Sequence, residues 1–196
     1  MTENTRDKIL SCSIALMAQK GFNYTGIAEI LAKAEVPKGS FYHYFKSKDA
    51  LGLAIIDQYG ESLAASLADF LDKQTTRPLV RLRAYFESVI ALYSTNFKFC
   101  NCLLGNFGQE LSLQDPDFRA AIFTQYARIE SIIAAVLREA QAEGSLSAAA
   151  DADMFATALL SGWEGALIRA KLAQSIVPVQ QFLIIFFEYS LPILKH

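Results

Sequence analysis

A segment near the start of the chain, residues 25–48, gathers side chains that could bind a nucleic acid; it reads TGIAEILAKAEVPKGSFYHYFKSK. Lysine can pair with a phosphate or reach a guanine edge, and serine, tyrosine and histidine can donate hydrogen bonds to phosphate oxygens. Glycine leaves room for the backbone to approach a duplex, and N–H groups at the start of a helix can bind a phosphate. We predict that DNA is contacted by Thr25, Gly26, Lys38, Gly39, Ser40, Tyr42, His43 and Lys48.

Enzyme chemistry finds little support in the rest of the chain. Its two histidines are His43, inside that segment, and His196, the last residue, so no histidine acid–base centre lies between them. Cys100 and Cys102 lack further ligands at the spacing of a zinc site, and the glycines of residues 105–108 follow no predicted strand and form no phosphate loop. Three cysteines, an odd and sparse number without a secretory signal, predict a reducing, cytoplasmic environment. We therefore predict that the protein is not an enzyme and has no metal or cofactor.

Helical periodicity dominates the sequence and predicts an all-α fold of about nine helices. Thr25 and Ser47 are suitable N-caps, Gly21 is a suitable C-terminal stop, and Pro37 suits a first helical turn. The apolar stretch 176–194 contains prolines and a glutamate, so it predicts a buried helix rather than a membrane span. The expected helices cover residues 4–20, 26–34, 37–44, 47–71, 77–97, 103–111, 115–143, 151–173 and 179–194.

The helix pattern predicts two domains, a helix-turn-helix head over residues 1–50 and a C-terminal regulatory and dimerisation body over residues 51–196. The head holds seven Lys and Arg against five Asp and Glu, whereas the whole chain has a net charge of −2. Two short helices need a shared core to present one of them to a major groove. The alternative is an ordinary amphipathic helix pair whose lysines are solvated charges. We predict a head core that includes Ile27, Ile30, Leu31, Val36, Phe41, Tyr44 and Phe45.

The motif KGSFYHYFKSKDAL, after the turn AEVP and the segment GFNYTGIAEIL, resembles the DNA-binding head of the tetracycline-repressor (TetR) family over about residues 5–52. The resemblance implies a homodimer with two reading heads, palindromic double-stranded operator DNA as a partner, and an inducer pocket in the C-terminal body. Glu35 is a departure, because family members commonly have glycine in this turn. Repression is what the family implies, and the sequence leaves activation open.

Two segments of the body, CLLGNFGQELSLQDPDFRAAI and LLSGWEGALIRAKL, resemble a narrower TetR subgroup that includes repressors of reductase genes answering to reactive electrophiles and oxidants. The resemblance implies that Cys102 is a sensing residue and that Lys171 can pair with it. A nearby cation, Lys98 or Lys171, would lower the pKa of a thiol. The alternative is that Cys100 and Cys102 are small buried hydrophobic residues.

A repressor of this kind converts inducer binding into a change in the spacing of two heads, which sit about 34–36 Å apart on adjacent major grooves. We predict an inducer pocket between the fourth helix and helices five to eight, lined by Tyr59, Phe86, Tyr93, Cys102, Phe107, Tyr126, Trp163 and Lys171. Small residues permit close helix packing, so we predict a four-helix dimer interface that includes Ala158, Gly162, Ala166, Phe182, Ile185, Phe186 and Tyr189. The alternatives are an aromatic core and packing of these last two helices within one subunit.

The sequence as a whole predicts a TetR-type DNA-binding regulator, a repressor released from its operator by a small-molecule or reactive electrophilic inducer, with no membrane partner. A helical protein-interaction module without a DNA role is the rival interpretation. Salt-dependent binding to a palindromic promoter fragment separates the two, because phosphate contacts release counterions and protein–protein contacts of such a module do not.

Overall fold

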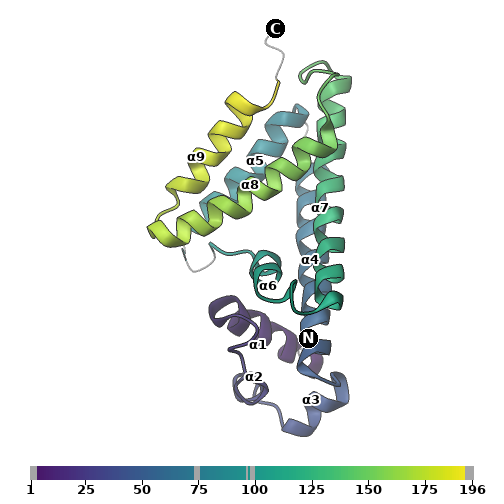
Figure 1. The fold of residues 1–196 in the computed structure, drawn as a ribbon, viewed down its shortest axis with the longest axis vertical. Helices are drawn as coiled ribbons and strands as arrows, with labels where there is room; N and C mark the ends of the chain where they lie inside the picture. The colour runs from purple at the N-terminus through teal and green to yellow at the C-terminus, as the bar shows by residue number, and fades with distance from the viewer. Residues whose placement is uncertain (1–3, 73–75, 96, 98–99, 193–196) are drawn as a thin grey trace. The chain divides into compact units, whose positions relative to one another are not determined.

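The computed structural model describes residues 4–72, 76–95, 97 and 100–192, and these residues form nine α-helices and no β-strand. The predicted all-α class is confirmed. A π-helical segment, Phe186–Ser190, follows the last helix. The helices are α1 (Thr5–Lys20), α2 (Ile27–Ala34), α3 (Lys38–Tyr44), α4 (Lys48–Asp72), α5 (Pro78–Thr95), α6 (Leu103–Leu111), α7 (Pro116–Ala142), α8 (Ala152–Ala173) and α9 (Val177–Ile185) (Figure 1).

The helices group into two compact units. The first unit comprises residues 1–62 and 102–125, so it holds α1, α2, α3 and α6 together with the first parts of α4 and α7. The second unit comprises residues 63–101 and 126–196, with α5, α8, α9 and the remaining parts of α4 and α7. The predicted boundary near residue 50 cuts the chain once, into a head and a body that are each continuous in sequence, and it stays a prediction. The first compact unit is discontinuous in sequence, because it also includes α6 from the second half of the chain.

Short-range signals set the ends of the first and fourth helices. The side chain of Asn4 caps α1 by accepting a hydrogen bond from the N–H of Arg6 at 2.8 Å. Gly21, with a φ of 85°, ends α1 in a backbone conformation that glycine adopts without strain. Ser47 Oγ accepts from the N–H of Ala50 at 3.0 Å, which confirms the predicted cap of α4.

The prediction that Thr25 is the N-cap of α2 is wrong. The helix begins at Ile27 with Gly26 as its N-cap. The Thr25 side chain is fully buried, and its hydroxyl donates to the carbonyl of Gly21 at 2.7 Å. The hydroxyl turns inward because the end of α1 leaves carbonyl groups without a helical partner. Pro37 likewise differs from the prediction, since it is the N-cap of α3 rather than part of its first turn.

The turn between α2 and α3 depends on Glu35, which has the left-handed conformation with φ 57° and ψ 41°. The N–H of Val36 donates to the carbonyl of Leu31 at 3.1 Å and closes the end of α2. Left-handed backbone favours glycine, because a Cβ atom crowds the neighbouring carbonyl there. Glu35 therefore occupies a geometry that suits the glycine expected from the family resemblance.

The core of the first unit is aromatic and aliphatic, and Phe41 anchors α3 in it with no exposed surface. The prediction that Tyr44 belongs to this core is wrong, because its side chain is 39% exposed. Its ring instead meets the ring of His43 edge-on at 4.8 Å. Ile27 and Val36 are half-buried. The other members of the predicted core are buried, together with residues from elsewhere in the unit: Ile30, Leu31, Phe45, Leu51, Ile55, Phe107 and Phe118.

In the second unit, Trp163 of α8 is the centre of a buried aromatic cluster. Its ring lies 4.9 Å from that of Phe86 and 6.4 Å from that of Tyr93, measured between centroids. The neighbouring helices α8 and α9 lie side by side (Figure 1), and the ring of Phe182 covers Gly162 so closely that a methyl group at this glycine would overlap it. The glycine therefore allows the close approach of these two helices within one chain.

The last helix starts earlier than the sequence predicted. It begins at Val177, with Pro178 in its first turn, and continues after Ile185 as the π-helical segment. The predicted end, Leu194, lies outside the described residues, as do Lys98 and His196. By length and composition, α7 could cross a membrane, a property that the core helix of a soluble protein shares.

Candidate nucleic-acid interface

Helix α3 buries one side chain and exposes most of the others. Phe41 is fully buried, whereas Tyr42 is 52% exposed, and Lys38, Gly39 and His43 are also exposed. Ser40 is half-buried. These residues supply an ammonium group, two hydroxyls and an imidazole on one short helix. Such a set suits hydrogen bonds to base edges and phosphates.

Gly39 lies on open surface. A Cβ atom built at this glycine would have no protein atom within 4 Å, and the same is true at Gly26. Glycine inside a helix lowers its stability by about 1 kcal/mol relative to alanine. No packing among the described residues requires residue 39 to be a glycine. A glycine at this place in α3 therefore fits a close approach by another molecule.

Two of the predicted phosphate contacts are engaged within the first unit. Both donors of Thr25 are used, since its N–H donates to the carbonyl of Phe22 at 3.1 Å and its hydroxyl to Gly21. Lys48 Nζ donates to the carbonyl of Asn23 at 3.3 Å and lies 4.5 Å from the centroid of the Phe22 ring. Their direct contact with DNA stays a prediction, and both hold the loop between α1 and α2.

The position of Lys48 lowers the pKa of its ammonium group. Burial is the main cause that lowers the pKa of its ammonium group, and the carboxylates of Glu110 and Asp49 offset part of that change. Lys33 and Lys46 are exposed and flank α3 in the sequence. Sequence reasoning did not select these two lysines, although their residue type was a sufficient signal. In the first unit, the ammonium groups of Lys33 and Lys46 are thus exposed to solvent, whereas Lys48 is half-buried.

Glu110 of α6 is a further residue of the first unit that sequence reasoning missed. Its carboxylate accepts hydrogen bonds from the backbone N–H groups of Phe22 at 2.8 Å and Asn23 at 2.6 Å. No local pattern could have indicated this contact, because the partners lie 88 and 87 residues away in the sequence.

The predicted inducer-pocket residues belong to both compact units. Tyr59, Cys102 and Phe107 are in the first unit, where Phe107 is fully buried and the other two are half-buried. The second unit contains the other five, of which three form the buried aromatic cluster. A single inducer pocket lined by all eight stays a prediction; the five are Phe86, Tyr93, Tyr126, Trp163 and Lys171.

The charge of Lys171 acts on Cys100, and its pairing with Cys102, which the resemblance implies, stays a prediction. Cys100 is 1% exposed, and burial raises the pKa of its thiol while the positive charge of Lys171 partly offsets that increase. Cys102 is half-buried and stands at the N-cap of α6. The two cysteines therefore have distinct surroundings, one withdrawn from solvent and one partly accessible.

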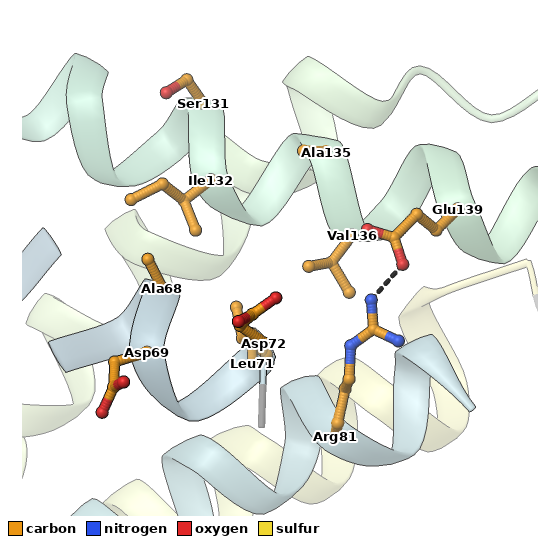
Figure 2. Close-up of a pocket in the computed structure, with 10 residues that line it drawn as sticks. All are labelled: Ala68, Asp69, Leu71, Asp72, Arg81, Ser131, Ile132, Ala135, Val136 and Glu139. Atoms are coloured by element: carbon orange, nitrogen blue, oxygen red, sulfur yellow. Dashed lines mark hydrogen bonds and ion pairs between the residues drawn. The ribbon is translucent and has the colours of Figure 1, made fainter. Parts of the chain in front are cut away.

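A groove of about 590 Å³ lies in the second unit between the end of α4, the start of α5 and α7. Figure 2 shows Arg81 directed toward Glu139, with which it forms an ion pair. The Nε atom of Arg81 is buried and has no hydrogen-bond partner. None of the predicted inducer-pocket residues lines this groove, which is bounded by Ala68, Asp69, Leu71, Asp72, Arg81, Ser131, Ile132, Ala135, Val136 and Glu139.

The residues of the predicted dimer interface have unequal exposure. Ala158 is exposed, and the side chains of Ile185 and Tyr189 are 55% and 79% exposed. Gly162 and Phe182 pack against each other, and Ala166 and Phe186 are buried within the chain. Their part in a dimer interface stays a prediction. Further apolar side chains are exposed on α8: Met154, Ile168 and Leu172.

Among the residues that the structure describes, no group of three His, Cys, Asp or Glu side chains could hold a metal ion.

The known proteins that resemble this chain are regulators. The profile of the bacterial regulatory proteins, tetR family, matches residues 9–55, and that of the tetracyclin repressor-like C-terminal domain matches residues 78–186.

Three curated relatives extend over most of the chain. The transcriptional regulator AcuR of Cereibacter sphaeroides is 38% identical over 89% of this chain and 80% of its own length. The repressor DhaR of a Mycobacterium species is 29% identical over 95% and 92%. The repressor NemR of Escherichia coli is 28% identical over 92% and 90%.

Two solved structures share the fold along nearly the whole chain. The regulatory protein TetR of Rhodobacter sphaeroides has a TM-score of 0.87 and 37% identity, and the alignment covers 94% of this chain and 98% of that one. The reduced form of E. coli NemR has a TM-score of 0.87 and 29% identity, with 94% and 95% covered.

Proposed function

Because the chain belongs to the TetR family of transcriptional regulators, we propose that it is a cytoplasmic repressor that binds an inverted-repeat operator as a homodimer and is released by a small-molecule inducer. The chain is a DNA-binding regulator and not an enzyme. The observation that carries the proposal is the surface of α3, where Gly39 lies open between exposed hydrogen-bond donors. A helix of this kind inserts into the major groove and reads base edges.

Selection from a pool of random duplexes with the purified full chain tests DNA binding and does not require a known operator sequence. We expect the selected duplexes to share an inverted repeat whose half-site centres are about one helical turn, 34–36 Å, apart. The affinity should fall steeply with salt, because neutralised phosphates release counterions. A pool that lacks a shared repeat, or an affinity that salt does not change, would favour the interaction module and refute the proposal.

The homodimer is supported by exposed apolar side chains on α8 and α9. Leu172 is 78% exposed, Ile185 55% and Tyr189, in the π-helical segment that follows α9, 79%, and large exposed apolar side chains of this kind are candidates for an interaction site. We expect Ile185→Asp to convert a dimer to a monomer in sedimentation at micromolar protein. Leu113→Asp is the control, since Leu113 is 96% exposed in the first unit and carries the same change of chemistry. A wild-type monomer, or an Ile185→Asp dimer as tight as the wild type, would contradict the proposed interface.

We further propose that a reactive electrophile is one class of inducer and that Cys102 is its target. The half-buried position of Cys102 at the start of α6 supports this assignment, because reactive cysteines are partly accessible, whereas Cys100 is buried. N-ethylmaleimide is a suitable probe, since its alkene adds the thiolate sulfur and then takes up a proton. We expect it to release the selected duplex from the wild type and from Cys100→Ser, and not from Cys102→Ser. Unchanged release from Cys102→Ser would refute the role of Cys102.

A further inference from the structure

The loop between α1 and α2, residues 21–26, is held by α6, a helix that lies more than 75 residues later in the chain. The carboxylate of Glu110 accepts the N–H groups of Phe22 at 2.8 Å and Asn23 at 2.6 Å, one on each oxygen. Hydrogen bonds to an ionised acceptor are shorter and stronger than those between neutral groups. The loop can approach the carboxylate because residue 21 is glycine: a Cβ atom at Gly21 would lie 2.9 Å from Glu110 Oε2.

The ring of Phe22 continues this contact into the core of the first unit. Its centroid lies 5.6 Å from that of Phe107 in α6 and 5.2 Å from that of Phe118 in α7. The ring also lies against α4, where a Cβ atom at Gly52 would approach Phe22 Cε2 to 2.6 Å. The loop is therefore fixed by a polar contact at its backbone and by aromatic packing at its first side chain.

Lys48 completes the arrangement from the start of α4. Its ammonium group donates to the carbonyl of Asn23 at 3.3 Å and lies over the ring of Phe22. Asn23 thus donates its N–H to Glu110 and accepts at its carbonyl from Lys48. Two side chains of opposite charge, from α6 and α4, bind the backbone N–H and carbonyl of this one loop residue.

We propose that Glu110 is a positioning residue for DNA recognition and acts by fixing the loop from which α2 begins. The inference rests on the proposed DNA-binding function and deepens it. α2 starts directly after the loop, and the short turn at Glu35 joins it to α3, so a shift of the loop displaces the helix that presents Gly39. Glu110 lies in α6 outside the predicted contact surface and acts through the loop, without touching DNA itself.

Glu110→Gln and Glu110→Ala test the proposal in the full chain, with the duplex selected by the wild type as the probe. Glutamine keeps one acceptor oxygen and removes the charge, and alanine removes both acceptors. We expect Glu110→Gln to weaken duplex binding by about tenfold and Glu110→Ala by more, because the alanine variant leaves both loop N–H groups without the carboxylate. Equal affinity of wild type and Glu110→Ala would overturn the proposal.

Glu29→Gln is the matched control. Glu29 is also in the first unit, forms an ion pair with Lys20, and undergoes the same loss of one negative charge. Removing a negative charge near DNA by itself favours binding, so we expect Glu29→Gln to bind as the wild type or slightly more tightly. If Glu29→Gln weakened binding as much as Glu110→Gln, the loss would follow from disturbing any carboxylate contact of the first unit, and the proposal would fail.

Amide hydrogen exchange separates positioning from a general loss of structure. We expect the N–H groups of Phe22 and Asn23 to exchange faster in Glu110→Gln, with exchange in the middle of α7 and in α8 unchanged. Faster exchange throughout the first unit, or unchanged exchange at these two amides, would overturn the proposal. The wild type reports on the proposed function separately: if it selects no duplex, DNA binding itself is refuted, whereas a wild type that binds beside an unaffected Glu110→Gln refutes only the role of Glu110.

Discussion

Gly39→Ala should separate the stability of the protein from its affinity for DNA. The added methyl group would have no protein atom within 4 Å, so nothing in the described residues opposes it. Alanine favours a helix interior over glycine by about 1 kcal/mol, and this value is the upper limit for Gly39, which is the second residue of α3. For a chain of this size, that gain corresponds to a rise in Tm of about 2–4 °C. We therefore expect the variant to be more stable than the wild type.

The same methyl group should weaken duplex binding, because it occupies the surface through which α3 would approach the major groove. The loss of one well-placed base contact costs about 1–3 kcal/mol, which is a factor of about 5 to 150 in affinity. Circular dichroism during thermal unfolding measures the first effect. Fluorescence anisotropy of a labelled, selected duplex measures the second.

Gly108→Ala is the matched control for this experiment. Gly108 lies inside α6, and a Cβ atom there would meet nothing closer than Ile122 Cγ2 at 3.9 Å. The control should gain similar stability and keep the wild-type affinity. If Gly39→Ala bound the duplex as tightly as Gly108→Ala, the assignment of the open face of α3 to DNA would be refuted.

Three other perturbations test separate parts of the structure. Glu35→Gly should raise the free energy of unfolding in urea by about 0.5–1 kcal/mol. The reason is that the strain energy relieved at the left-handed residue exceeds the cost of the added conformational entropy of the unfolded chain. A lower stability than that of Glu35→Ala would contradict this. Gly60→Ala should destabilise it by about 1–3 kcal/mol, since the new Cβ would lie 2.6 Å from Cδ of Gln125, and Gln125→Ala in the same chain should restore part of the loss. Because burial raises the pKa of Cys100, less thiolate is present at pH 7 than for an ordinary thiol. Iodoacetamide should therefore modify Cys100 more slowly than the half-buried Cys12, and the modification rate of Cys100 should keep rising at pH values where that of an ordinary thiol has levelled off. Faster modification of Cys100 than of Cys12 at pH 7, measured by peptide mass spectrometry, would refute this.

Features set by neighbouring residues were predictable from the sequence. Ser47 caps α4 because its hydroxyl needs only the amide three residues later, and α6 has the predicted limits, Leu103–Leu111. Thr25 shows where this reasoning fails, since a cap and an inward hydrogen bond to Gly21 are both available to the same hydroxyl. The choice between them depends on how deeply the loop is buried, which no local pattern records.

Contacts between distant segments were not predictable, although their residue types were visible. Glu110 resembles an ordinary surface acid at the end of a short helix, and only the fold brings it to the backbone of Phe22. The sequence pattern favours Gly162 as part of an interface between subunits, whereas the fold places Phe182 of the same chain over it. Small residues allow close helix packing but do not specify which helix approaches, so the partner has to come from the structure.

The use of backbone donors in the α1–α2 loop has a consequence for how mutations are tolerated. Because Glu110 binds the N–H of Asn23 and not its exposed side chain, most replacements at position 23 leave that hydrogen bond in place. Proline is the exception, since it has no N–H to donate. A saturation library should therefore accept almost any residue at 23 except proline and accept few at 110, so that one contact produces a permissive site and a restrictive one.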